Sequence, residues 1–210
     1  MYGDTAHMHP GTEVAPRSRK GSLRAEAAAM MLDPAMRGGR RVALGRAADF
    51  FGPGATLSAI FGERFFRRVL EGKAGESFGD PDMPHSDSYV PDVAAGLVAL
   101  GTSSSAEGVY MLPMQPAETT RAVMQRFYRV LGKDLGVARV PTWALRAMGL
   151  FNPTVRELVE MIYQWEQPFE VDDARVRAEF GLAPTPWDDA VAATVAWGRS
   201  TFSSPGSGRR

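Results

Sequence analysis

A basic segment near the start of the chain is the first place where side chains could do chemistry. The segment PRSRKGSLRAE, residues 16–26, leads into a helix predicted for residues 19–32. Its cations are Arg17, Arg19, Lys20 and Arg24. Cations are unfavourable at a helix N-terminus, because the free amide groups there already carry partial positive charge. The segment is therefore either a solvated helix start or a place for an anionic partner such as a phosphate.

Polar and aromatic side chains also follow the first predicted strand. The segment RVALGRA, residues 41–47, has the compact apolar character of a buried strand, and Asp49 and Phe50 come just after it. Ligands of open α/β sheets bind beyond the carboxyl ends of strands, so Asp49 could face a ligand. Its carboxylate could equally cap the turn, and both interpretations stay open.

A histidine and several aspartates form a third candidate group in the segment 75–87, which we predict to be an acidic, turn-rich loop. The members are His85, Asp80, Asp82 and Asp87. Histidine and carboxylate side chains bind metals, but one histidine among turn aspartates is more often a solvated loop. We predict no metal here, nor at the pair His7 and His9.

The composition argues against several classes of function. Lys plus Arg and Asp plus Glu each number 24, so no net charge draws the chain to nucleic acid or to a membrane. We expect neither as a partner, and no apolar run is long enough to span a bilayer. The absence of cysteine excludes thiolate chemistry and fits a cytoplasmic protein. Motifs of hydrolases, metalloproteases and P-loop NTPases are absent.

The order of the predicted elements indicates an α/β fold with a mostly helical second lobe. Strands are predicted at 41–47 and 108–113, and residues 1–18 are predicted to be a loop. Further helices are predicted within 58–72, 88–101, 117–136, 152–165 and 185–198. Two parallel strands cannot cover their own faces and edges. Either the sequence pattern does not reveal all of the strands, or the chain is a piece of a larger fold.

Several segments, taken in order, resemble the C-terminal two-thirds of the NAD(P)-dependent epimerase/dehydratase family, which are extended or atypical short-chain dehydrogenases/reductases. They are YG at Tyr2, TE at Thr12, RAE at Arg24, GRAADFFGPGA from Gly45, YVPDVAAGLVAL from Tyr89, GVYMLP, RELVEMIYQ, PTP and TVAW. The resemblance implies the last strands of a Rossmann-type, doubly wound NAD(P)-binding fold with a helical substrate lobe. It assigns residues 1–200 to a partial domain and leaves 201–210 as a flexible tail.

The resemblance also implies an N-terminal truncation. Family members begin with a glycine-rich turn that binds the cofactor pyrophosphate, and no such turn follows a strand here. They also carry a catalytic Tyr-x-x-x-Lys pair, whose two positions are Ser18 and Ser22 in this sequence. Lys20 or Arg24 could replace the missing cation, and Lys20 is taken as the catalytic candidate.

The remaining site residues are assigned by the same resemblance. Arg46, Ala47 and Ala48 are expected to form the wall of an NAD or NADP site. The substrate side is expected to consist of Asp49, Phe50, His85 and Tyr89. An aspartate at position 49, where relatives carry asparagine, disfavours the phosphates of sugar nucleotides and suits a hydroxyl-rich or cationic ligand.

The family therefore implies an NAD(P)-dependent epimerase, dehydratase or reductase acting on a small hydroxylated or carbonyl molecule, and leaves a homodimer open as its assembly. The missing tyrosine and lysine support an alternative, a dinucleotide-binding or sensor module without turnover. An inactive fragment is the third interpretation. For the chain as written we expect weak NAD(P) binding and exposed apolar surface beside the sheet.

Overall fold

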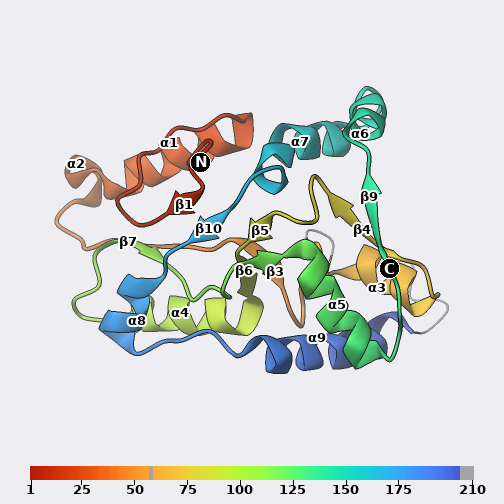
Figure 1. The fold of residues 1–210 in the computed structure, drawn as a ribbon. Helices are drawn as coiled ribbons and strands as arrows, with labels where there is room; N and C mark the ends of the chain where they lie inside the picture. The colour runs from red at the N-terminus through yellow and green to blue at the C-terminus, as the bar shows by residue number, and fades with distance from the viewer. Residues whose placement is uncertain (57–58, 204–210) are drawn as a thin grey trace.

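The computed structural model describes residues 1–56 and 59–203 (Figure 1). Its helices are α1 Arg19–Leu32, α2 Pro34–Arg37, α3 Glu63–Leu70, α4 Val90–Thr102, α5 Thr120–Leu131, α6 Thr142–Gly149, α7 Pro153–Met161, the 3₁₀ helix η1 Ile162–Trp165, α8 Ala174–Phe180 and α9 Trp187–Phe202. Its strands are β1 His7–Met8, β2 Ala43–Arg46, β3 Asp49–Phe51, β4 Gly75–Phe78, β5 Pro84–His85, β6 Asp87–Tyr89, β7 Gly108–Met111, β8 Glu118–Thr119, β9 Val137–Val140 and β10 Glu170–Val171.

The strands form two-stranded pairs, and most of these pairs are parallel. The two strands predicted from the sequence are partners, since β2 lies parallel to β7. Strand β3 pairs with β6, β4 with β9 and β1 with β10, all in parallel, while β5 and β8 are antiparallel. A parallel pair needs a long crossover connection, which explains why partners lie far apart in the sequence. The α/β fold class is confirmed.

The predicted loop at residues 75–87 is wrong. It contains β4 and β5 and ends at the first residue of β6. The segment is rich in Gly, Asp and Pro, which favour turns, and its strands are only two to four residues long. Tertiary pairing therefore outweighs local preference. The predicted N-terminal loop likewise contains the short strand β1.

Helix ends follow the local chemistry of the sequence. Thr119 caps α5 by accepting a hydrogen bond from the Ala122 amide at 3.1 Å, and the helix ends at Gly132 with φ of 68°. Helix α9 begins at Trp187, directly after Pro186, and has two acidic residues in its first turn. It continues to Phe202, the second residue of the predicted tail, and residues 204–210 lie outside the described part of the chain.

The largest buried cluster joins α3, α5 and α9 beneath β3. Phe61, Phe65, Phe66 and Phe127 pack in edge-to-face and stacked pairs, and the side chains of Val191 and Val195 on α9 close the cluster. In Figure 1 these three helices lie along the lower right of the molecule. This core holds β3 and β6 in place, and those two strands carry the candidate site.

Large apolar side chains are also exposed. They include Leu23, Met30, Met31 and Met36 on the first two helices, Leu97 and Val98 on α4, and Trp143, Leu150 and Phe151 around α6. None of the helices in residues 1–56 and 59–203 has the length and apolar character needed to cross a membrane.

Candidate functional site

The candidate site lies where β2 ends and β3 begins. Arg46 is the last residue of β2, and Ala47 and Ala48 connect it to Asp49, the first residue of β3. The Ala48 amide donates a hydrogen bond to the Ser88 hydroxyl at 2.9 Å. The short link is therefore fixed to β6, and Asp49 stands directly opposite Asp87 in the parallel register.

Asp49 and His85 form the central contact of the site. Nε2 of His85 donates to Oδ2 of Asp49 at 2.9 Å, so two predicted substrate residues from separate strands meet. The His85 side chain is only 4% exposed, whereas the Asp49 side chain is 34% exposed. Asp49 is thus the residue of the pair that a ligand can reach, and the buried His85 side chain holds its carboxylate in place.

Aromatic rings enclose the imidazole of His85. The Phe169 ring stacks on it at a centroid distance of 4.6 Å and the Trp165 ring at 6.0 Å. Within the described residues, Nε1 of Trp165 has no hydrogen-bond partner. The backbone of Gln164 forms a hydrogen bond with the His85 imidazole. The two stacked rings and this backbone contact hold the imidazole in place.

Charge decides the protonation of His85. Burial disfavours the charged imidazole, but the hydrogen bond that it donates to Asp49 and the negative charges of Asp49 and Asp87 outweigh this effect and raise the pKa of His85. The imidazolium is therefore stabilised between two carboxyl groups. Such a cation can hold the Asp49 carboxylate in its orientation through the hydrogen bond at 2.9 Å.

Asp87 is the residue of this cluster that sequence reasoning placed only in a loop. Its pKa is raised to about 7, mainly by burial; the charge of His85 opposes this rise and the charge of Asp49 adds to it. A carboxyl group that titrates near neutral pH is suited to proton transfer, although structural networks show the same shift. Its position at the start of β6 could have been found only from the strand register.

Arg46 contacts the first residues of the chain. Its guanidinium group donates a short hydrogen bond to the Tyr2 hydroxyl and lies 5.1 Å from the centre of the Tyr2 ring. Burial and the charges of Arg24 and Arg46 lower the pKa of the amino group of Met1. Positive charge therefore gathers beside the predicted cofactor wall.

The two predicted aromatic substrate residues have opposite environments. Phe50 is 42% exposed, unlike the other phenylalanines near it, so it is available to a ligand. Tyr89 is buried in the main core, with its ring 5.3 Å from that of Phe51. The same ring leaves no room for a side chain at Gly52, whose φ is 119°. Tyr89 therefore positions β3 from the core side.

Lys20 lies apart from this cluster, in the first turn of α1. Its Nζ makes an ion pair with Glu157 on α7 at 2.6 Å, and its side chain is 55% exposed. The Arg19 amide donates to Glu160 of the same helix at 3.3 Å. The basic helix start was expected to suit an anionic partner. Glu157 and Glu160 of α7 supply these anions within this chain.

The two serines at the expected tyrosine and lysine positions have structural roles. Ser18 caps α1 by accepting a hydrogen bond from the Gly21 amide at 3.1 Å, and its hydroxyl contacts the sulfur of Met161. Ser22 donates to the Ser18 carbonyl within the same turn. The described part of the chain holds no group of three or more His, Cys, Asp or Glu residues that could bind a metal ion.

Comparison with known proteins gives matches among solved structures alone. Neither a protein-family model nor a curated protein sequence matches the chain. UDP-glucuronic acid 4-epimerase from Bacillus cereus, solved with NAD, superposes with a TM-score of 0.71 at 15% identity over 98% of this chain. dTDP-glucose 4,6-dehydratase from Bacillus anthracis, also with NAD, gives 0.71 at 18% identity over 96%. RMD from Pseudomonas aeruginosa, with NADPH, gives 0.71 at 19% identity over 95%.

The fold is that of the NAD-dependent epimerases and dehydratases. The likeness covers the C-terminal part of those proteins, as the resemblance predicts. The chain spans 59%, 58% and 63% of the lengths of these three structures. In this epimerase/dehydratase fold, the contact between Asp49 and His85 lies beyond the carboxyl end of β2, where open α/β sheets bind ligands.

Proposed function

We propose that this chain forms the substrate lobe of an NAD(P)-dependent epimerase, dehydratase or reductase that acts on a small hydroxylated or carbonyl substrate. The observation that carries the proposal is the pairing of Asp49 with His85 in this fold. A half-exposed carboxylate held by a buried imidazole is preorganised to accept hydrogen bonds from substrate hydroxyls.

The charge of Asp49 narrows the substrate class. A fixed carboxylate repels phosphate groups and attracts hydroxyl or cationic groups. Phe50, the next residue of β3, also exposes an apolar ring, but successive side chains of a strand point to opposite faces, so this ring lies on the other face of β3 from the Asp49 carboxylate. We therefore expect small polyhydroxy or carbonyl compounds to bind better than sugar nucleotides.

The residues present fit one side of a nicotinamide cofactor. The side chains of Ala47 and Ala48 pack against buried clusters, so a cofactor would meet the backbone of the link after β2, and Arg46 supplies positive charge beside it. When bound, such a cofactor supplies hydride acceptance and donation. This chain's own part would be to orient the substrate hydroxyl through Asp49 and to hold that carboxylate in place through His85.

The test is binding of free polyols and of sugar nucleotides, followed by nuclear magnetic resonance of the labelled chain. We expect polyols to perturb the signals of Asp49 and His85, and Asp49→Asn to weaken that binding about tenfold, as expected for one charge-assisted hydrogen bond. Asp188→Asn on exposed α9 is the matched control. Equal binding by Asp49→Asn and the unaltered chain would remove Asp49 from the site.

A second function, a dinucleotide sensor without turnover, is favoured by the structural roles of Ser18 and Lys20. Neither is free to act as the family tyrosine or lysine, because Ser18 caps α1 and Lys20 pairs with Glu157. Incubation with NADH or NADPH and simple carbonyl compounds separates the two functions. Oxidation of the cofactor supports the enzyme, whereas binding without oxidation supports the sensor.

A further inference from the structure

Helix α6 turns a largely apolar face to solvent. Four residues with the spacing i, i+3, i+4 and i+7 share this face, namely Trp143, Arg146, Ala147 and Leu150. Trp143 is 74% exposed, Leu150 is 76% exposed, and Phe151, directly after them, is 90% exposed. Large apolar side chains that are exposed together, unlike single ones, mark a contact surface.

The opposite face of α6 is occupied by the fold itself. Leu145 is buried in a cluster with Ile162 and Trp165. A side-chain carbon at Gly149 would lie 3.2 Å from Cα of Arg156, so α7 packs directly against α6 at this point. The outward face takes no part in this packing and is left for a contact outside the chain.

Positive charge lies beside the exposed apolar side chains. Residues 135–156 contain no acidic residue and three exposed arginines, which are Arg139, Arg146 and Arg156. Within the described residues, Arg139 and Arg146 make no ion pair. Glu157 of α7 is engaged elsewhere, because it pairs with Lys20 of α1 at 2.6 Å. This part of the chain is therefore cationic as well as apolar.

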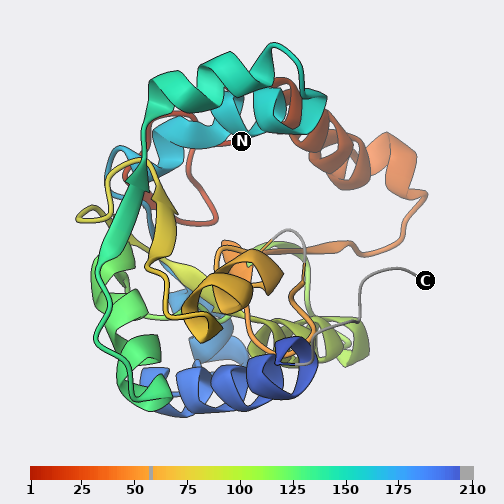
Figure 2. The ribbon, with the colours of Figure 1, turned by 90° about the vertical axis from the view of Figure 1, so that its right-hand side faces the viewer.

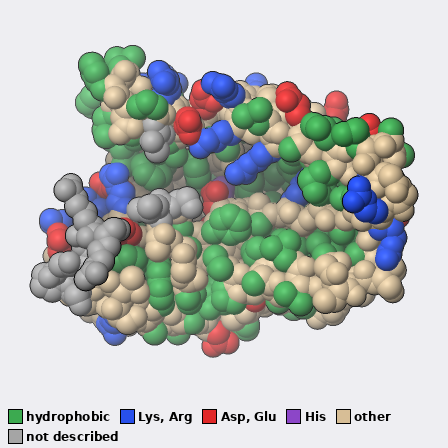
Figure 3. All heavy atoms as spheres, turned by 180° about the vertical axis from the view of Figure 1, so that it is seen from behind, with side chains coloured by type: hydrophobic (Ala, Val, Ile, Leu, Met, Phe, Trp, Pro, Cys, Tyr) green, Lys and Arg blue, Asp and Glu red, His purple; other side chains and the backbone are tan. Residues whose placement is uncertain are grey.

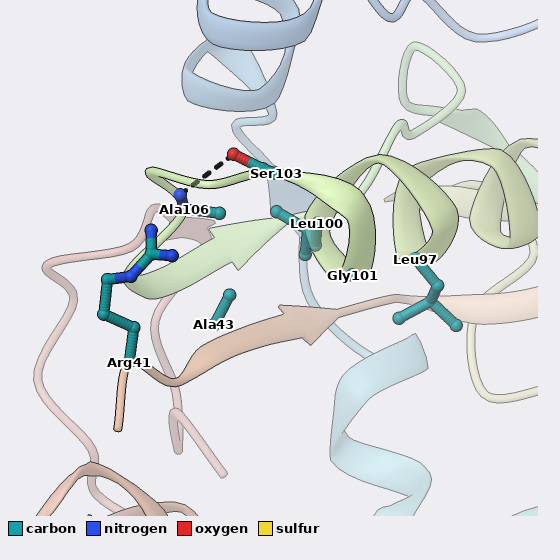
Figure 4. A pocket seen from close by; sticks show the side chains of 7 residues that line it. All are labelled: Arg41, Ala43, Leu97, Leu100, Gly101, Ser103 and Ala106. Atoms are coloured by element: carbon teal, nitrogen blue, oxygen red, sulfur yellow. Dashed lines mark hydrogen bonds between the residues drawn. The ribbon is translucent and has the colours of Figure 1, made fainter. Parts of the chain in front are cut away.

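The face lies on a projecting corner of the molecule. In Figure 2, α6 and α7 run in teal along the top of the view, above β9, while β2 lies in the middle. Figure 3 shows hydrophobic side chains gathered over α6 and α7 at the upper left, with Lys or Arg side chains beside them. A pocket of about 380 Å³, lined by Arg41, Leu97 and Leu100 among others, lies elsewhere, between α4 and the amino end of β2 (Figure 4). The corner is thus separate from that pocket and from the open side of the sheet.

We propose that the outward face of α6 binds an anionic membrane surface and lies in its headgroup region without crossing the bilayer. Tryptophan, phenylalanine and leucine beside arginine are typical of helices that lie in this interface, where the apolar side chains enter the lipid and the cations meet anionic headgroups. A projecting corner suits a deformable lipid surface, whereas the central side chains of protein interfaces fill pockets of the partner. A second copy related by a twofold axis would bring Arg146 near its own counterpart, and like charges repel.

The charge balance of the whole chain does not oppose this contact. The absence of net charge led us to expect no membrane partner. At physiological salt, however, charges act over only about 10 Å, so a membrane senses the local arginines and not the sum over the chain.

Cosedimentation of the chain with lipid vesicles tests the proposal. The probes are vesicles of phosphatidylcholine alone and vesicles of equal parts phosphatidylcholine and phosphatidylserine. We expect binding to the second kind, and its loss at high salt. Leu150→Ser should weaken binding about tenfold or more, because the leucine no longer enters the apolar layer. Leu23→Ser, at a 57% exposed leucine on α1, is the matched control and should bind like the unaltered chain.

A second pair of variants tests the charge. Arg146→Gln should weaken binding to the vesicles with phosphatidylserine about fivefold, as expected for one basic residue at an anionic surface. Arg129→Gln, at an exposed arginine on α5, is the matched control and should leave binding unchanged.

The fluorescence of Trp143 gives an independent readout. Trp165 and Trp187 are buried and Trp197 is partly buried, so a shift of the emission to shorter wavelength on adding vesicles reports Trp143. Trp143→Phe should keep most of the binding and abolish the shift.

The proposal is overturned if vesicles with phosphatidylserine leave the emission unchanged, or if Leu150→Ser and Leu23→Ser bind them equally. A dimer that Leu150→Ser converts to a monomer in analytical ultracentrifugation would assign the face to a second copy instead. Circular dichroism of each variant shows that it is folded. No readout needs a cofactor or a substrate, so this proposal and the proposed function can fail separately.

Discussion

At the scale of single residues, the contact between His85 and Asp49 gives the site its geometry. His85 is buried, stacks on Phe169 and donates to Asp49, so its removal leaves a cavity and an unfixed carboxylate. We expect His85→Gln to lower the free energy of unfolding by about 2 kcal/mol. Urea denaturation measures this, and His7→Gln, at a 76% exposed side chain, should change it by less than about 0.5 kcal/mol.

Asp87 should make stability depend on pH. Its pKa is about 7 in the folded protein, compared with an ordinary value of 3.8. Between these two pH values the folded state keeps a proton that the unfolded state has released. The raised pKa of His85 acts in the same direction at higher pH. Stability should therefore fall as pH rises from about 4 to about 7, the range between the two pKa values of Asp87.

Asp87→Asn should flatten this profile, because the asparagine has no proton to lose. The difference between the variant and the unaltered chain is at most roughly 4 kcal/mol across this range. Urea denaturation at a series of pH values is the measurement. A profile that keeps its full slope in the variant would assign the effect to another group.

At the scale of elements, the packing of α9 on α3 can be tested with two glycines. A side-chain carbon at Gly198 would lie 2.3 Å from the Phe66 ring, whereas one at Gly101, near the end of α4, meets nothing within 4 Å. We expect Gly198→Ala to destabilise the protein by about 2 kcal/mol through overpacking. Gly101→Ala should stabilise it by up to about 1 kcal/mol through helix propensity. Thermal denaturation of both variants checks the pair, and equal shifts would contradict the α3 contact.

The elements also show what the sequence could predict. Helices with caps and apolar stripes, such as α1 and α5, were found with their ends nearly correct, because those signals are local. The strands β4 and β6 were missed, because each depends on a partner far along the chain. The resemblance placed His85 and Asp49 on the same expected substrate side, and only the register of β3 with β6 showed how Asp87 joins them.

At the scale of the whole molecule, the described chain contains the residues that we propose for one wall of a cofactor site. The glycine-rich turn that binds pyrophosphate in this fold is absent from the sequence, and Lys20 is engaged with Glu157. We expect NAD and NADP to bind the 210-residue chain weakly or undetectably. Isothermal titration calorimetry checks this, and a tight complex would show that the residues present are sufficient.

The pairing of β1 with β10 has a consequence for how the chain folds as it is made. His7 lies opposite Glu170, so the N-terminal segment leaves the ribosome long before its partner strand has been synthesised. Such distant pairings form slowly, and the segment has to wait without its partner strand. Because of this order of synthesis, we expect the segment around Tyr2 to be one of the last parts of the molecule to reach its folded position. The contact between Tyr2 and Arg46 therefore also forms late.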